Sequence, residues 1–240
     1  MNYALIVAAG KGTRMQSPVA KPYMPLAGVP ILRRTLLAFD LCPIIDAIYL
    51  VISAAERAVC RREVIDPLRL STSLTVVAGG DSRQASVYNG LAAMDSGEHW
   101  VGIHDGVRPF ITSGQIASCF NAASAGAGCV LGIPVAETLK QVDSRGAIRR
   151  TQQRKGIWLA QTPQVFKLTE ILEAHRDARN NAFIATDDAA LMERIGRPVK
   201  MLPGSSLNMK ITTSEDLKLA EAIVAAGLHH PQSPEHLDDS

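Results

Sequence analysis

The apolar run Tyr3-Ala4-Leu5-Ile6-Val7 leads directly into Ala8-Ala9-Gly10-Lys11-Gly12-Thr13-Arg14-Met15 near the start of the chain. The apolar run predicts a buried first strand. The two glycines that follow leave backbone N–H groups bare, so that the main chain can wrap a polyanion. Three cations, Lys11, Arg14 and Lys21, lie within eleven residues of chain. The combination predicts a loop that binds the phosphates of a nucleoside triphosphate.

Two common phosphate-binding motifs do not account for this stretch. A P-loop requires the pattern G-x-x-x-x-G-K-[ST], which does not occur in the sequence. A dinucleotide fingerprint requires G-x-G-x-x-G, and here the third glycine is missing after Gly10 and Gly12. The prolines Pro18, Pro22 and Pro25 predict a long irregular loop rather than an immediate helix. The stretch alone leaves a surface turn with solvated charges as the alternative.

Composition is typical of a globular protein. With 240 residues and 47% hydrophobic side chains, the chain can build one sizeable core, and we expect a single domain over residues 1–227. The net charge of +2 and the 5% aromatic content argue against general nucleic-acid binding. Residues 228–240 are aperiodic and contain His, Pro and acidic residues, which predicts a disordered tail.

The cysteines and the apolar runs bear on the cellular compartment. The four cysteines form no C-x-x-C pair, so we expect buried free thiols at Cys42, Cys60, Cys119 and Cys129. No apolar run reaches 18 residues, which argues against a transmembrane helix. The first strand begins at once, without the pattern of a signal peptide. These features predict a cytoplasmic protein without a membrane partner.

Predicted strands and helices alternate along most of the chain. This order is typical of an α/β fold with a Rossmann-like, doubly wound and mainly parallel sheet. We expect strands at Tyr3–Val7, Ala47–Ile52, Leu74–Ala78, Trp100–His104, Cys129–Pro134 and Val199–Leu202. We expect helices at Pro30–Phe39, Ala54–Leu68, Ser82–Met94, Ile111–Ala125, Thr169–Arg179 and Asp187–Ile195, and a last helix that ends at Ala226. Ser82 and Thr186 are expected N-caps, and the stretch Thr212–Asp216 resembles a capping box.

The alternation stops between Glu137 and Trp158. This segment is polar, and Asp143-Ser144-Arg145-Gly146 is a hairpin signal, so we expect a two-stranded β-arm over about residues 137–158 that projects from the sheet. An isolated hairpin is only marginally stable in water. Because Leu139, Val142 and Ile148 are interspersed among the polar residues, we expect the arm to pack on a second subunit, which makes the protein a homodimer.

Polar clusters follow three of the predicted strands at the point where each strand ends. They are Gly10–Arg14 after the first strand, Gly80–Arg83 after the third and Asp105–Pro109 after the fourth. In open α/β sheets, ligands bind outside the carboxyl ends of the strands. The sequence therefore predicts one binding site at this edge of the sheet.

The motifs resemble those of a known family. The glycine loop with Lys21-Pro22 is similar to the signature loop of sugar-phosphate nucleotidylyltransferases. Five further motifs narrow the resemblance to the 2-C-methyl-D-erythritol 4-phosphate cytidylyltransferases of the non-mevalonate isoprenoid pathway: Gly79–Val87, His104–Pro109, Gln161–Gln164, Thr186–Asp188 and Asn208–Thr212. The resemblance covers about residues 2 to 226.

The resemblance implies a reaction between two anions. A phosphate oxygen of the acceptor attacks the α-phosphorus of CTP, the co-substrate, and pyrophosphate leaves. Cations must offset the repulsion and stabilise the charge that grows at phosphorus. By resemblance, the catalytic residues are Arg14, Lys21, Arg154 and Lys210, and the cofactor is Mg²⁺. Since Mg²⁺ is usually held by one or two carboxylates plus phosphates, Asp105 is a weak candidate ligand and the CTP phosphates would hold most of the ion.

The resemblance also implies two sets of binding residues. Those for CTP are Ala8, Ala9, Gly10, Lys11, Gly12, Arg14, Lys21, Gly80, Asp81, Ser86, Asp105, Gly106 and Lys210. Those for the acceptor are Asp105, Arg108, Thr138, Arg154, Thr162, Thr186 and Lys210. Thr138 and Arg154 fall in the predicted arm, which implies that they reach the site of the neighbouring subunit. The alternative for the basic residues of the arm is an ordinary solvated hairpin.

Two other functions stay open at this point. A ribitol 5-phosphate cytidylyltransferase shares the loop and the base pocket, although the context of Gly156–Trp158 and Ala185–Asp188 favours the methylerythritol enzyme. A catalytically silent regulatory domain of the same fold is expected to have lost Arg14, Lys21 or Lys210, and the sequence retains all three.

Overall fold

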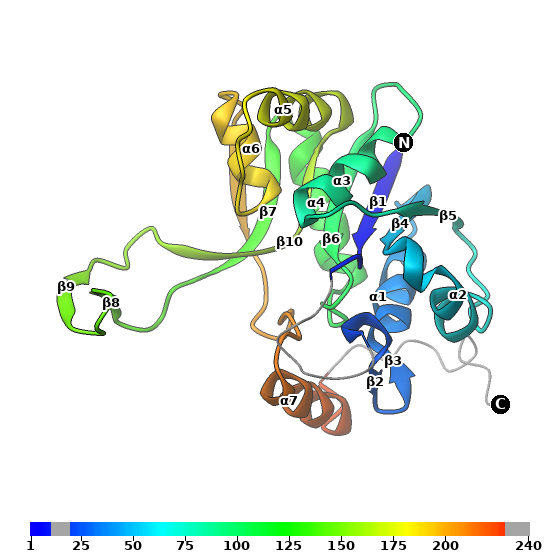
Figure 1. Ribbon diagram of the computed structural model, residues 1–240, viewed down its shortest axis with the longest axis horizontal. Helices are drawn as coiled ribbons and strands as arrows, with labels where there is room; N and C mark the ends of the chain where they lie inside the picture. Colours follow the sequence, from blue (N-terminus) through cyan, green and yellow to red (C-terminus); the bar gives the residue numbers. More distant parts are fainter. Residues whose placement is uncertain (11–19, 229–240) are drawn as a thin grey trace.

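The computed structural model describes residues 1–10 and 20–228, so Lys11, Gly12 and Arg14 and nearly all of the predicted tail lie outside the described residues. Its centre is a seven-stranded sheet with the strand order β11-β7-β10-β6-β1-β4-β5 (Figure 1). The strands are β1 (Asn2–Val7), β4 (Ala47–Ile52), β5 (Ser73–Ala78), β6 (Trp100–Asp105), β7 (Gly128–Pro134), β10 (Trp158–Lys167) and β11 (Val199–Pro203). The pairings β1–β4, β1–β6, β4–β5 and β7–β11 are parallel, which confirms the predicted mainly parallel sheet.

Helices cover both faces of this sheet. They are α1 (Ile31–Asp40), α2 (Arg57–Cys60), α3 (Arg83–Ala92), α4 (Ser113–Ser124), α5 (Leu168–Asn180) and α6 (Asp188–Arg194). The last helix, α7 (Ser214–Ala225), packs away from the sheet in a separate cluster with Leu26 and Ile31. Side chains alternate between the faces of a strand, and in β1 Ile6 packs in the same core as α1 and α4, whereas Leu5 packs in the core of α3 and α5. Both side chains are completely buried. The first strand is therefore buried on both faces, as its continuous apolar run predicts.

The sequence did not predict strand β10, nor the two short antiparallel strands β2 (Pro25–Leu26) and β3 (Val29–Pro30). Strand β10 runs antiparallel to both of its neighbours, β6 and β7, in the middle of the sheet. Pro163 and the flanking polar residues argue against a central strand. The structure accommodates them with a bulge between Ala160 and Gln164, and Gln164 is buried with its side chain bonded to backbone and carboxylate groups of α6 and its N-cap.

Two helix predictions need correction. The stretch expected as one helix over Ala54–Leu68 consists of a 3₁₀ turn (Ala54–Glu56), the short helix α2 and a π-helical segment (Arg61–Ile65). Its β-branched residues Val59, Val64 and Ile65 have lower helix propensity, and Pro67 disfavours helical backbone at the preceding residue. The predicted N-cap Thr186 is also wrong, because Asp187 accepts the capping hydrogen bond from the Ala190 N–H at 3.0 Å.

Other local predictions are confirmed. Ser82 caps α3 by accepting a hydrogen bond from the Ala85 N–H at 3.0 Å. Thr213 and Asp216 form the predicted capping box at the start of α7. The four cysteines are buried and free. No helix in the described part of the chain has the length and apolarity needed to cross a bilayer.

The predicted arm is present as a hairpin of β8 (Leu139–Val142) and β9 (Ile148–Gln152). Figure 1 shows it extending away from the sheet on the continuations of β7 and β10. Its apolar residues Val142 and Ile148 are 51% and 63% exposed. Within the described chain, no other segment covers these two side chains.

Candidate active site

A pocket of about 350 Å³ lies at the edge of the sheet where β1, β5 and β6 end. The three strand ends predicted to meet there do so, with Gly10, Gly80 and Asp105 among the residues that line the pocket. The lining residues are Val7, Ala8, Ala9, Gly10, Lys21, Pro22, Gly80, Asp81, Ser82, Arg83, Ser86, Asp105, Val107, Lys210, Ile211 and Thr212. The pocket thus combines a backbone surface from β1 with cations from three separate segments.

The backbone wall of the pocket depends on small residues. An added Cβ at Gly79 would collide with the Cβ of Ala9 and lie 2.9 Å from the Ser86 Oγ. Only glycine at this position allows the end of β5 to approach Ala9 and α3 so closely. The Ser86 hydroxyl then accepts a hydrogen bond from the Gly80 N–H at 3.0 Å, which fixes the loop that is predicted to read the base.

Asp105 is the electrostatic centre of the pocket. Its Oδ1 lies 3.1 Å from the Nε of Arg83, and its Oδ2 lies 2.8 Å from the Nζ of Lys210 and 3.6 Å from the Nε of Arg108. Burial alone would raise the pKa of Asp105, but the charges of Arg83 and Lys210 outweigh burial and hold that pKa well below its usual range. Asp105 is therefore ionised, and it pairs with Arg83 and Lys210, two of the cations that line the pocket.

Lys21 and Lys210 approach the pocket from opposite ends of the chain. Lys21 follows the glycine loop in a 3₁₀ turn (Lys21–Tyr23), is only 8% exposed, and donates a hydrogen bond from Nζ to the backbone oxygen of Thr212 at 2.6 Å. The segment that carries Lys210 is fixed by a hydrogen bond from the Ile211 N–H to the backbone oxygen of Val107 at 3.0 Å. Two predicted catalytic lysines therefore share one wall of the pocket.

Beneath Asp105 lies a buried polar group centred on His104. The Thr162 hydroxyl accepts a hydrogen bond from the Asp105 N–H at 3.1 Å and lies 3.0 Å from the Nδ1 of His104. The Nε2 of His104 lies 3.1 Å from the backbone oxygen of Arg108. Burial lowers the pKa of His104 to about 4, so the ring is neutral at pH 7. The Thr162 hydroxyl thus holds the end of β6 in place.

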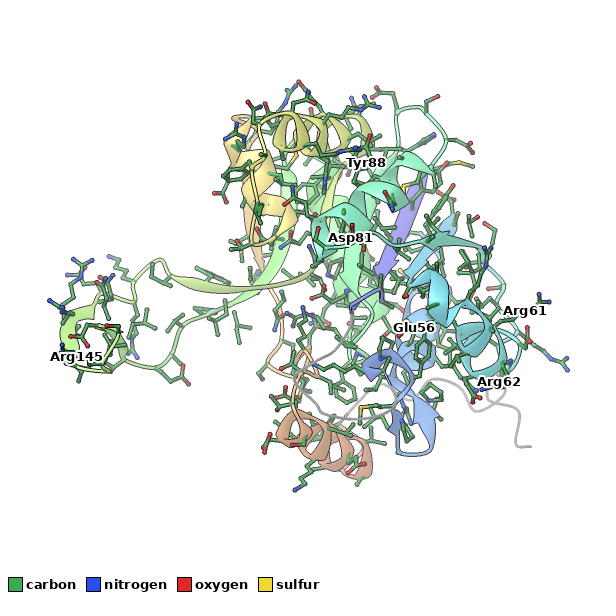
Figure 2. All side chains as sticks on the ribbon, viewed as in Figure 1. Glu56, Arg61, Arg62, Asp81, Tyr88 and Arg145 are labelled. Carbon is green, nitrogen blue, oxygen red and sulfur yellow. The ribbon has the colours of Figure 1, made fainter. Side chains whose placement is uncertain are left out.

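The remaining predicted residues lie in three places. The described residues that line the pocket include neither Gly106 nor Arg108. The Nη1 of Arg108 instead donates a hydrogen bond to the backbone oxygen of Asn208 at 2.8 Å. Thr186 is exposed just before α6. Thr138 and Arg154 are exposed on the arm. Figure 2 shows how far the arm tip, marked by Arg145, lies from Asp81 at the pocket.

Sequence reasoning missed Arg83 as a site residue. Its side chain lines the pocket and bridges Asp105 to Asp188, whose Oδ2 lies 2.8 Å from the Nη1 of Arg83. The signal was present, since Arg83 belongs to the polar cluster at the end of the third predicted strand. Its partner Asp188 could not be identified from the sequence, because the contact joins positions 105 residues apart.

The fold and the pocket define a class of protein. A doubly wound sheet that presents glycine-lined backbone, cations and one ionised carboxylate at the carboxyl ends of its strands is typical of nucleotide-binding α/β enzymes. Among the described lining residues, the hydroxyls of Ser82, Ser86 and Thr212 are used in local hydrogen bonds and the other polar side chains are charged. Such a pocket suits nucleotidyl transfer, which needs charge stabilisation and no covalent nucleophile.

Comparisons with known proteins give the family. The family model of 2-C-methyl-D-erythritol 4-phosphate cytidylyltransferase matches residues 2–226. A protein of this name from Geobacter metallireducens is 45% identical over 225 residues, covering 92% of this chain and 97% of the relative. Another from Pelotomaculum thermopropionicum is 41% identical over 223 residues, covering 93% and 94% of the two chains.

Solved structures agree with this result. The crystal structure of 4-diphosphocytidyl-2C-methyl-D-erythritol synthase from Anaerococcus prevotii matches with a TM-score of 0.82 and 30% identity, over 93% of this chain and 96% of that one. The chain belongs to the 2-C-methyl-D-erythritol 4-phosphate cytidylyltransferase family. It transfers CMP from CTP to 2-C-methyl-D-erythritol 4-phosphate and releases pyrophosphate, a step of isoprenoid biosynthesis.

Proposed function

We propose that the pocket binds the triphosphate of CTP between the backbone of Ala8–Gly10 and the side chains of Lys21 and Lys210. The observation that carries this proposal is the convergence of both lysines on one pocket around Asp105. An acceptor phosphate oxygen forms a bond to the α-phosphorus of CTP, the bond from that phosphorus to the bridging oxygen breaks, and pyrophosphate departs. The lysines stabilise the negative charge on the phosphoryl oxygens during this exchange.

Arg14 is assigned to the same role. It lies outside the described residues, and the proposal rests on its place in the glycine loop between the end of β1 and Lys21. Together with Lys11 and Gly12 it would complete the phosphate-binding surface that begins at Ala8–Gly10. Arg14 and Lys21 would then contact the phosphates from one segment and Lys210 from another.

The cytosine base is assigned to the loop that follows β5. Backbone groups of Gly80 and Asp81 offer donors and acceptors, and the Ser86 hydroxyl holds this loop through the Gly80 N–H. Cytosine differs from uracil in its N4 amino donor and N3 acceptor. A rigid backbone edge can discriminate between these patterns, because a mismatched base would leave a buried polar group unpaired.

The acceptor is assigned to a site completed by a second subunit. Asp105, Arg108, Thr162, Thr186 and Lys210 belong to one chain, while Thr138 and Arg154 would come from the arm of the partner. Two observations support a homodimer of this kind: the arm extends away from its own sheet (Figure 1), and its apolar residues are exposed. Covering those residues in a dimer would stabilise a hairpin that is marginal alone.

Mg²⁺ is proposed as the metal of the reaction. The described residues contain no group of three or more His, Cys, Asp or Glu side chains that could hold an ion by themselves. Asp105 is an ionised carboxylate in the pocket, and together with the CTP phosphates it fits the donor set that Mg²⁺ prefers. When bound, the ion would supply further neutralisation of the phosphate charge.

The cytoplasm is proposed as the site of the reaction, supported by four buried free thiols, which a reducing compartment preserves.

The proposed site is tested with a Lys21→Met variant. The assay measures the release of pyrophosphate from CTP in the presence of Mg²⁺ and 2-C-methyl-D-erythritol 4-phosphate. We expect turnover to fall by about 10²–10³ relative to the unmodified protein, the usual cost of one transition-state donor. Lys200→Met, a change at an exposed lysine of β11, is the matched control and should leave turnover unchanged. Ribitol 5-phosphate in place of methylerythritol phosphate should give no release. Normal turnover by the Lys21 variant would refute the assignment.

A further inference from the structure

Asp188 is a buried carboxylate that the reaction described above does not use. It is the first residue of α6, and its side chain is 2% exposed. Its Oδ2 lies 2.8 Å from the Nη1 of Arg83, and its Oδ1 lies 3.2 Å from the Nε2 of His175. His175 is a residue of α5 and is completely buried. A charge this deep in the fold is costly unless it is paired, so the geometry of its partners matters.

Arg83 connects this buried pair to the pocket. Its guanidinium contacts two carboxylates at once, Asp188 through Nη1 and Asp105 through Nε at 3.1 Å. Burial opposes the charge of Arg83, but the carboxylates of Asp188 and Asp105 outweigh burial and raise the pKa of Arg83. The planar guanidinium fork is suited to such a bridge, and an ammonium group is not. The contacts form one series from His175 through Asp188 and Arg83 to Asp105.

Asp188 and His175 themselves stand outside the pocket. Among the described residues that line the pocket, Arg83 is present and neither Asp188 nor His175 is. His175 instead lines a separate cavity of about 470 Å³, which also includes Arg83 and Tyr88. The side chain of Asp188 therefore reaches the pocket through its contact with Arg83.

We propose that Asp188, held by His175, is a positioning residue that anchors Arg83 and so keeps the Oδ2 of Asp105 available for Lys210. This inference rests on the proposed role of Lys210 at the phosphates. The Nε of Arg83 contacts Oδ1 of Asp105, while Oδ2 lies 2.8 Å from the Nζ of Lys210 and 3.6 Å from the Nε of Arg108. A guanidinium that loses Asp188 can turn its fork toward both oxygens of Asp105, because bidentate pairing is its favoured geometry. Lys210 would then be displaced from its partner.

The test is a double-mutant cycle in steady-state kinetics. Asp188→Asn keeps the shape of the side chain and removes its charge, and we expect kcat to fall by about 10–100-fold, the range for residues that orient a functional group. Arg83→Lys should lower kcat as well, because a lysine cannot bridge two carboxylates. In the double variant the second change should cost nothing further, since Asp188 acts through Arg83. Losses that multiply, or a normal kcat for Asp188→Asn, would overturn the proposal.

A matched control separates positioning from mere stability. Asp177→Asn breaks the other carboxylate contact between α5 and α6, a 2.6 Å pair with the Nε of Arg194, without touching Arg83. We expect this variant to lose thermal stability without a change in kcat. An Asp177 variant that loses as much kcat as the Asp188 variant would show that any loosening of the two helices suffices, which contradicts the proposal.

A second pair of variants covers the case in which Asp188→Asn does not fold. His175→Gln retains an N–H that can donate to Asp188, whereas His175→Leu does not. We expect kcat to fall in the leucine variant and to recover in the glutamine variant, and equal kcat in both would overturn the proposal. Lys210→Met, measured alongside, tests the proposed function itself. If Lys210→Met keeps full turnover, the role of Lys210 fails, while the coupling of Asp188 to Arg83 is still decided by the cycle.

Discussion

The pocket and the β-arm carry similar residues in opposite environments. In the pocket, the carboxylate of Asp105 is 10% exposed and contacts three cations of its own chain. On the arm, Arg149 is 68% exposed and Arg154 is exposed as well. Charges in the pocket are thus fixed by the fold of a single chain. Those of the arm lie on an exposed hairpin, where water screens them, so the two regions should respond differently to substitution.

The largest effect is expected in the pocket. Lys210→Met removes the cation that contacts Asp105 Oδ2, and kcat should fall by about 10²–10³ because the proposed donor to the phosphates is lost. Pyrophosphate release under saturating CTP is the measurement. Lys218→Met, at an exposed lysine of α7, serves as the control and should behave like the unmodified protein. An unchanged kcat in the Lys210→Met variant would show that the pocket tolerates loss of a charge as well as the arm does, which contradicts the expected difference.

A smaller and more selective effect is expected on the arm. Arg154→Ala should raise KM for the acceptor phosphate by about 10–100-fold, the value of one hydrogen bond to a charged group, and should leave KM for CTP unchanged. Arg145→Ala, at the tip of the arm (Figure 2), is the control, for which we expect no change in either constant. An equal rise in both KM values for Arg154→Ala would mean that the arm does not distinguish the two substrates.

Lowering the pH should destabilise the buried polar group centred on His104 before it affects the arm. His104 has a pKa of about 4 in the fold, below the value of about 6.5 of an unfolded histidine. Its neutral form is favoured by folding, so the unfolded state binds more protons between these pH values and stability falls as the pH drops through this window. The loss from this residue is about 2 kcal/mol between pH 7 and pH 5.

Urea unfolding at the two pH values measures this loss. In a His104→Gln variant the pH-dependent part attributable to the ring should disappear, although the variant is less stable at both pH values. An unchanged difference between pH 7 and pH 5 in the variant would show that His104 is not the titrating group.

The smallest effect is expected for the surface charge of the arm. Arg149 pairs with Asp143 at 3.4 Å, and exposed pairs of this kind contribute little because water screens them. Arg149→Ser should therefore change neither the melting temperature nor kcat beyond experimental error. A clear loss of activity would show that Arg149, in addition to Arg154, contacts the site of the partner.

Patterns of short range were predictable from the sequence. The apolar run of β1, the hairpin signal of the arm and the capping box of α7 each depend on neighbouring residues, and each is confirmed. The pocket at the strand ends was predictable too, because parallel strands bring their carboxyl ends to one edge.

What escaped prediction depends on distant contacts. Strand β10 contains Pro163 and buried glutamines, and its pairing with β6 and β7 outweighs its weak local preference. The bridge from Arg83 to Asp188 requires that α3 and α6 lie together, which no local pattern encodes. Thr186 failed as the N-cap because Asp187, one residue on, has the extended backbone and the carboxylate that the cap requires.

The central claim is that the pocket of one chain and the arm of another form a single active site. Mixing the Lys21→Ala and Arg154→Ala variants, after unfolding and refolding them together, tests it directly by pyrophosphate release. Heterodimers would contain one site with both residues intact. At an acceptor concentration well below the raised KM of the Arg154 variant, we therefore predict that the mixture is more active than the sum of its two parents. A mixture no more active than the sum of its two parents would contradict the claim and assign both residues to the same chain.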